Sequence, residues 1–68
     1  MAYEVWVNGT ATSVPPNRSV ADLVREYSDR QTGIAVALNQ TVLTRDEWAG
    51  TTLTDGDRVE IVSAVQGG

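Results

Sequence analysis

The chain has 68 residues, enough for one small domain, and it contains neither cysteine nor histidine. Disulfide bonds, thiol nucleophiles, zinc sites of the usual ligand types and imidazole acid–base catalysis are therefore excluded. The five basic residues are all arginines scattered among nine carboxylates, and the net charge is −4. This balance argues against binding to nucleic acid or to an anionic membrane surface. Because lysine is also absent, Schiff-base chemistry is excluded, and we expect a protein that is not an enzyme and binds no metal or cofactor.

The chain has no run of about 20 apolar residues of the kind that spans a membrane. Its N-terminus lacks the basic region and apolar run of a signal peptide. No repeat or linker interrupts it. We therefore expect a cytoplasmic protein with a single domain over residues 1–68.

The N-terminal part predicts a β-hairpin. Tyr3, Val5 and Val7 alternate with polar or outward-facing residues, which is the period of a strand. Asn8-Gly9 follows, and this pair favours a two-residue turn because both residues tolerate positive φ. Residues 10–14 then form a second, antiparallel strand, which ends at Pro15-Pro16 because proline donates no backbone hydrogen bond.

A helix is predicted over residues 20–30. Ser19 is a suitable N-cap, and Asp22 favours the positive end of the helix dipole. One apolar stripe has the helical spacing that points it at a sheet: Val20, Leu23, Val24 and Tyr27.

The second half predicts three further strands, at residues 34–38, 41–43 and 58–65. Thr44 to Glu47 has the form of a capping box, so a single helical turn should carry Trp48 inward. The simplest arrangement that buries these apolar faces together is a mixed five-stranded sheet with one main helix packed on one face. The predicted fold class is α+β, with the ubiquitin-like β-grasp architecture.

With one helix on the sheet, the other face should meet water and be polar. The alternation instead places apolar side chains there: Trp6, Val62 and Ala64. We assign these three to a partner-docking surface, since exposed apolar patches often bind proteins. The alternative is that scattered exposed apolar residues carry no function. Three acidic residues, Asp55, Asp57 and Glu60, should form a cluster near the C-terminal end of the chain. They either steer a basic partner or are solvated turn charges, and the second interpretation is favoured.

The chain ends in Gly67-Gly68, and we expect residues 65–68 to form a flexible tail. Such a tail is either frayed and inert or functional. Two glycines without Cβ atoms allow an extended segment to thread a narrow channel in another protein. The Gly68 carboxylate then reaches an active site, where ATP can activate it as an acyl-adenylate and a sulfur nucleophile can convert it to a thiocarboxylate. No internal Cys, His or Lys competes for the acyl group.

The sequence also resembles a known family, the ThiS sulfur carriers of bacterial thiamine biosynthesis. The resemblance is carried by DRQTGIAVALN at residues 29–39 with TRDEW at 44–48, and by DGDRVEIVSAVQGG at 55–68. It extends over essentially the whole chain. Thr44 departs from the family, in which many members carry proline, and this affects the stiffness of the turn.

The resemblance implies that Gly68 is the site of adenylation by a ThiF-type enzyme and of thiocarboxylation with sulfur from a donor protein. The thiazole synthase ThiG would then take the sulfur. Two alternatives remain open: the small sulfur-carrier subunit of molybdopterin synthase, and a ubiquitin-like protein modifier whose Gly68 forms isopeptide bonds.

Overall fold

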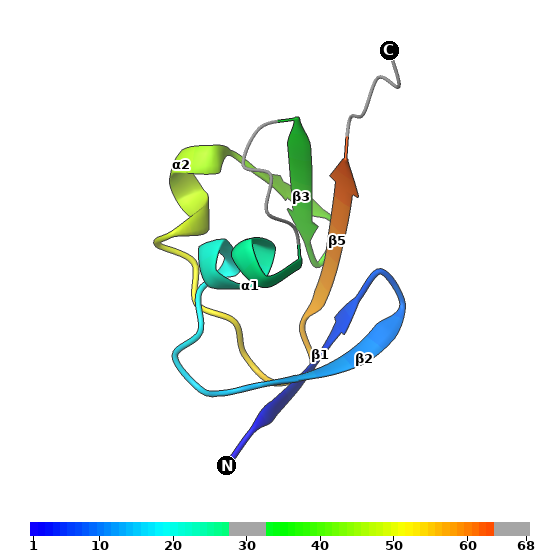
Figure 1. Cartoon of the computed structure of the whole chain (residues 1–68), viewed down its shortest axis with the longest axis vertical. Helices are drawn as coiled ribbons and strands as arrows, with labels where there is room; N and C mark the ends of the chain where they lie inside the picture. Colours follow the sequence, from blue (N-terminus) through cyan, green and yellow to red (C-terminus); the bar gives the residue numbers. More distant parts are fainter. Residues whose placement is uncertain (28–32, 64–68) are drawn as a thin grey trace.

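The computed structural model describes residues 1–27 and 33–63, in which five strands form one mixed sheet (Figure 1). The strand order is β2-β1-β5-β3-β4. β1 and β5 pair in parallel, and the other neighbouring strands are antiparallel. The elements are β1 (Tyr3–Val7), β2 (Thr10–Val14), α1 (Val20–Tyr27), β3 (Ile34–Leu38), β4 (Thr41–Leu43), α2 (Arg45–Trp48) and β5 (Arg58–Ser63). This arrangement confirms the predicted α+β architecture, with β5 at the centre of the sheet.

The β1–β2 hairpin forms as predicted. Asn8 and Gly9 both have positive φ, 52° and 84°, as a type I′ turn requires. The turn sets the register, in which Val7 pairs with Thr10 and Tyr3 with Val14. A register fixed in this way determines which face of the sheet each side chain occupies.

Helix α1 begins where the sequence predicts. The Ser19 hydroxyl accepts a hydrogen bond from the Asp22 N–H at 3.1 Å, and the Asp22 carboxylate accepts one from the Ser19 N–H at 3.2 Å. These reciprocal bonds satisfy donors that the first helical turn leaves free. The predicted continuation at residues 28–30 lies outside the described residues.

Three members of the predicted helical stripe are buried, namely Val20, Leu23 and Val24. The fourth is not: Tyr27 is 52% exposed, so its assignment to the core is wrong. Its hydroxyl instead accepts a hydrogen bond from the Asn8 side-chain amide at 3.0 Å, at the turn of the hairpin. A polar group at the tip of the ring keeps this side chain at the surface.

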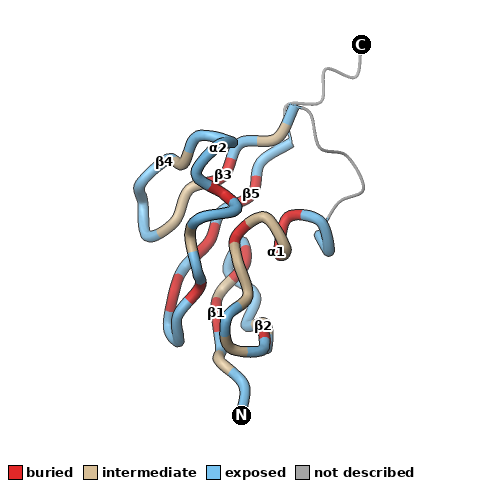
Figure 2. The backbone as a smooth tube through the Cα atoms, turned by 90° about the vertical axis from the view of Figure 1, so that its left-hand side faces the viewer, coloured by how far each residue is buried: buried red, intermediate tan, exposed pale blue. Residues whose placement is uncertain are grey.

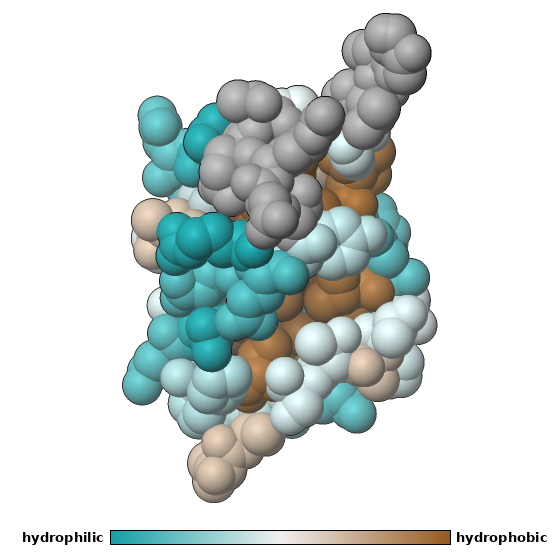
Figure 3. Space-filling model, in the orientation of Figure 1, coloured by the Kyte–Doolittle hydropathy of each residue, from teal (hydrophilic) through white to brown (hydrophobic). Residues whose placement is uncertain are grey.

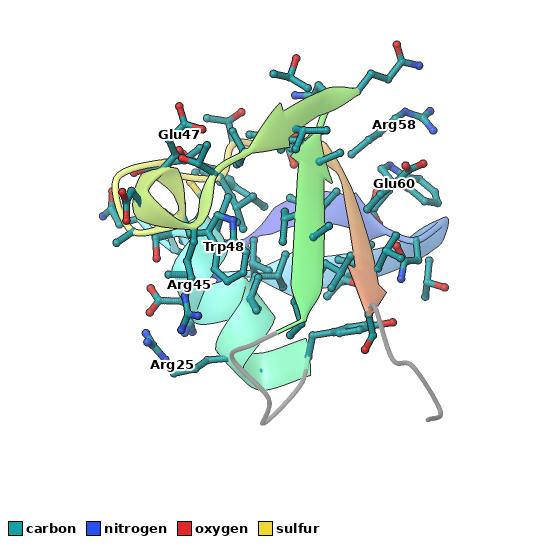
Figure 4. The ribbon with its side chains drawn as sticks, turned by 90° about the horizontal axis from the view of Figure 1, so that it is seen from above. Arg25, Arg45, Glu47, Trp48, Arg58 and Glu60 are labelled. Carbon is teal, nitrogen blue, oxygen red and sulfur yellow. The ribbon has the colours of Figure 1, made fainter. Side chains whose placement is uncertain are left out.

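The second half of the sheet also follows the prediction, and the predicted continuation of the last strand at residues 64–65 lies outside the described residues. Asn39 and Gln40 form the tight turn between β3 and β4, with φ of 50° and 73°. Glu47 accepts a hydrogen bond from the Thr44 N–H at 2.7 Å and so fixes the start of α2. Trp48 is buried and points from α2 towards β3, while the Arg45 guanidinium lies 5.8 Å from its ring centroid (Figure 4). The Trp48 Nε1 has no hydrogen-bond partner among the described residues.

The core lies between the sheet and the two helices (Figure 2). In β5 the alternation is as predicted, because Val59 and Ile61 are buried and Glu60 and Val62 are exposed. Leu53, in the irregular segment before β5, is fully buried although no periodic pattern marks it. The buried hydrophobic residues are Val5, Val7, Val14, Val20, Leu23, Val24, Val36, Trp48, Leu53, Val59 and Ile61.

Candidate functional site

The sheet face opposite the helices, here called the open face, contains the predicted docking residues that the structure describes. Figure 4 shows Arg58 and Glu60 projecting from β5 on the side away from α1 and α2. Val62 follows on the same strand with the same parity and is 59% exposed. It pairs with Ala35 of β3. The prediction that Val62 faces away from the core is therefore confirmed, whereas its role in docking stays a prediction.

Trp6 lies on the open face as predicted, but it is half-buried and distant from Val62. It pairs with Ala11 of β2 on one side and with Arg58 of β5 on the other. Val62 is four positions further along β5, which is about 13 Å at the usual rise of a strand. On β5, the exposed Glu60 lies between Arg58, the partner of Trp6, and Val62. Trp6 and Val62 therefore share a face without forming one contiguous patch.

A different set of neighbours surrounds Val62. Val42 of β4 is 73% exposed and pairs with Ala37 of β3. Ala35 and Ala37 have the same parity on β3, so these alanines connect Val62 to Val42 across three strands. We call this set, Ala35, Ala37, Val42 and Val62, the open-face patch. The sequence analysis did not include Val42. The two-residue turn at Asn39-Gln40 fixes the register of β4 against β3, and this register places the Val42 side chain on the open face.

The last three predicted site residues, Ala64, Gly67 and Gly68, lie outside the described residues. The structure does show where the chain reaches them. Ser63 ends β5, the central strand, and pairs with Ile34 of β3. Residues 64–68 follow directly from the strand whose open side carries Val62. The open-face patch and the start of the C-terminal segment are therefore adjacent.

The acidic residues near β5 serve the fold. Asp55 accepts a hydrogen bond from the Glu4 N–H at 2.8 Å, and the Asp57 carboxylate accepts bonds from the Thr54 N–H and the Asn39 amide. Both precede β5, at the end opposite Ser63. Their placement in a cluster beside the C-terminus is therefore wrong, because the whole of β5 intervenes. Glu60 alone remains on the open face.

No catalytic constellation appears in the part of the chain that the structure describes. One carboxyl has a lowered pKa, that of Asp22, because the Ser19 backbone N–H and hydroxyl and then Arg25 stabilise its charged form. This group caps α1. Among residues 1–27 and 33–63, no group of three or more acidic side chains is placed to hold a metal ion. Within the same ranges, no helix has the length and apolarity to cross a membrane.

These observations define the class: a β-grasp protein with an apolar patch beside the end of its central strand, after which the sequence runs on to Gly67 and Gly68. Comparison with known proteins identifies the family. The ThiS family model matches residues 5–68. The chain therefore belongs to the ThiS family.

Individual relatives agree with this assignment along the whole chain. The sulfur carrier protein ThiS of Escherichia coli (strain K12) is 29% identical over 65 residues, which cover 96% of this chain and 98% of the relative. ThiS of Thermus thermophilus is 33% identical over 64 residues, covering 94% and 98%. The crystal structure of the thiamine biosynthesis protein ThiS from Geobacter metallireducens superposes with a TM-score of 0.78 at 32% identity, covering 96% of this chain and 99% of that one.

Proposed function

We propose that this ThiS-family chain carries sulfur as a thiocarboxylate on its C-terminal residue, Gly68. Membership of the ThiS family supports the role of a sulfur carrier in thiamine biosynthesis. Such a carrier is a small co-substrate and not an enzyme. The observation that carries the chemical proposal is the position of the C-terminal segment, which follows directly from the central strand beside the open-face patch. A terminal carboxylate becomes an acyl donor once it is activated, and no Cys, His or Lys side chain of this chain competes for the activated acyl group.

The chemistry requires two steps, both performed by partners. The Gly68 carboxylate oxygen attacks the α-phosphorus of ATP, pyrophosphate leaves, and an acyl-adenylate forms. A hydrosulfide ion (HS⁻), the sulfur species that the donor protein supplies, then attacks the acyl carbon. The carbon–sulfur bond forms as the carbon–oxygen bond to AMP breaks, AMP leaves, the S–H proton is lost to solvent, and Gly68 becomes a thiocarboxylate. ATP is bound by the activating enzyme, so this chain needs no resident cofactor, and we place the reaction in the cytoplasm, where ATP is available.

The dimensions of the chain limit how these partners bind. Five residues follow Ser63, and five fully extended residues span at most about 17 Å. An activating enzyme must therefore hold this domain close to its catalytic centre. We propose that the open-face patch, with Trp6 further along the same face and Ala64 beyond Ser63, supplies that contact. The partners would be a ThiF-type adenylating enzyme first and the ThiG thiazole synthase afterwards.

The test of the chemistry is intact mass spectrometry. The full chain is incubated with the ThiF-type enzyme of the same organism, ATP and a sulfur donor. We expect the C-terminal peptide to gain the mass difference between sulfur and oxygen. A chain lacking Gly68, and a chain with a C-terminal amide, should both remain unmodified. An unchanged Gly68 with an enzyme that visibly consumes ATP would contradict the proposal, and conjugation of Gly68 to lysines of other proteins would favour a protein modifier instead.

A further inference from the structure

Strand β2 is an edge of the sheet, and the backbone groups of two of its five residues point away from β1. The Trp6 N–H donates to Asp57 O at 2.8 Å, and Glu4 O accepts from the Gly56 N–H at 2.7 Å. These two residues of β1 thus use their backbone groups on the β5 side. Their partners in β2, Ala11 and Ser13, therefore occupy the pairs that exchange no hydrogen bonds with β1. The N–H and C=O groups of Ala11 and Ser13 face outward.

This edge lacks the devices by which proteins usually protect an exposed strand. Such edges carry charged side chains, an internal proline or a bulge. The β2 sequence is Thr-Ala-Thr-Ser-Val, with no charge and no proline, and its register with β1 is continuous over all five residues. In the described part of the chain, no other strand pairs with it. The edge is a regular, uncharged template for another strand.

A groove runs beside this edge on the helix side of the sheet. It has a volume of about 400 Å³ and lies between α1 and the β1–β2 hairpin. Val7 and Leu23 form its apolar floor, and Thr10 and Thr12 line it from the β2 side. Tyr27 and Glu26 line the helix side. Figure 3 shows hydrophobic surface between the polar helix and the hairpin.

The edge and the groove together determine what fits. A strand added to β2 continues the pleat, so every second side chain of that strand faces the helix side of the sheet. Those side chains would enter the groove over Val7 and Leu23, while the strand's backbone pairs with Ala11 and Ser13. We propose that the β2 edge and this groove bind an extended, basic segment of a partner protein by strand addition.

Charge favours a basic partner over a second copy of this chain. The chain carries a net charge of −4, so two copies repel each other while a cationic segment is attracted at long range. At the groove itself, Glu26 is 55% exposed and forms an ion pair with Arg18 at 2.7 Å. An incoming cation can share this carboxylate. The site lies on the helix side of the sheet at the β2 edge, whereas the open-face patch lies on the other face over β5, β3 and β4, so it does not depend on the proposed function.

The direct test is titration of the full, ¹⁵N-labelled chain with the peptide Lys-Val-Thr-Val-Thr-Val-Lys, monitored by NMR. We expect saturable shifts of the Ala11 and Ser13 amides together with those of Leu23 and Tyr27. The matched peptide with glutamate in place of both lysines should bind more weakly. Added salt should reduce this difference, because screening weakens the attraction between exposed charges.

A proline substitution separates strand addition from unspecific contact. Ser13→Pro removes an outward N–H without breaking a bond to β1, so the hairpin should persist. We expect it to weaken binding of the lysine peptide by about tenfold or more, since a backbone hydrogen bond is lost and the ring obstructs pairing. Ser13→Ala is the matched control, because it changes the same exposed side chain and keeps the outward N–H. It should leave the affinity unchanged.

Several outcomes would overturn the proposal. No shift at millimolar peptide, shifts confined to the open face, or equal binding by the Ser13→Pro and Ser13→Ala variants would each do so. A concentration-dependent dimer that pairs through β2, seen by ultracentrifugation and abolished by Ser13→Pro, would assign the edge to a second copy of the chain instead.

Discussion

Asn8 combines a backbone role and a side-chain role at the end of β1. Its φ of 52° closes the hairpin. Its side-chain oxygen accepts from the Ile61 N–H at 2.9 Å, and its amide donates to Ile61 O at 3.1 Å and to the Tyr27 hydroxyl at 3.0 Å. The side-chain amide thus acts as one more peptide group and extends the short parallel ladder between β1 and β5. One residue connects the hairpin, the central strand and α1.

Substitutions at Asn8 should separate these roles. Asn8→Gly keeps the backbone conformation but loses the side-chain bonds, and we expect the free energy of unfolding to fall by about 1–3 kcal/mol. Asn8→Ala loses the same bonds and adds the strain of positive φ, which costs about 1–2 kcal/mol more. Urea denaturation of both variants measures the difference. An alanine variant as stable as the glycine variant would show that the turn conformation adds no constraint.

At the level of elements, local chemistry determines most of what the sequence predicts. Alternation identified β1 and β5, the Asn8-Gly9 pair identified the hairpin, and capping residues identified the starts of both helices, because each signal acts within a few residues. Leu53 could not be predicted, since its burial depends on the packing of an irregular segment without a period. Tyr27 has the correct helical spacing, but its hydroxyl bonds to a distant turn, which spacing alone does not reveal.

The cap of α1 predicts a pH dependence. The pKa of Asp22 is lowered from 3.8, chiefly by the Ser19 N–H and hydroxyl, with Arg25 adding to the effect. A carboxyl whose pKa is lower in the folded state stabilises the fold above its unfolded pKa, and this contribution is lost as pH falls through the folded value. Asp22→Asn should therefore be less stable than the parent chain at pH 6, and the difference should shrink as the pH falls below 3.8.

Thermal unfolding at several pH values measures this effect. Asp46→Asn is the matched control, because it removes the same charge from the first turn of α2. A stability difference between parent chain and Asp22→Asn that is constant with pH would show that the charge of Asp22 does not contribute to the cap.

At the scale of the whole molecule, the sequence predicted the faces of Trp6 and Val62 but not their neighbours. Parity within one strand assigned Trp6 and Val62 to the same face. Their separation depends on how β1 is offset along β5, and this register is set by long-range contacts such as the bond from the Trp6 N–H to Asp57 O. The same long-range pairing brings Val42 into the open-face patch. The tail chemistry stays a proposal, because Gly67 and Gly68 lie outside the described residues.

This geometry predicts that the two docking candidates respond differently to a charge. Val62 is largely exposed, so Val62→Asp should leave the free energy of unfolding almost unchanged and weaken binding of the ThiF-type enzyme by about tenfold or more, as expected when an apolar contact residue is lost. Trp6 is half-buried, so Trp6→Asp should also lower stability. Thr41→Asp places the same charge on the helix side of the sheet, at an exposed position of β4, and serves as the control.

Calorimetric titration with the enzyme, paired with urea denaturation of each variant, distinguishes docking from folding. Docking through the open-face patch requires Val62→Asp to bind weakly while Thr41→Asp binds like the parent chain. If both bind like the parent chain, the patch is not the contact surface. The C-terminal segment would then have to bring the domain to the catalytic centre alone, and its five residues would have to supply the whole binding free energy.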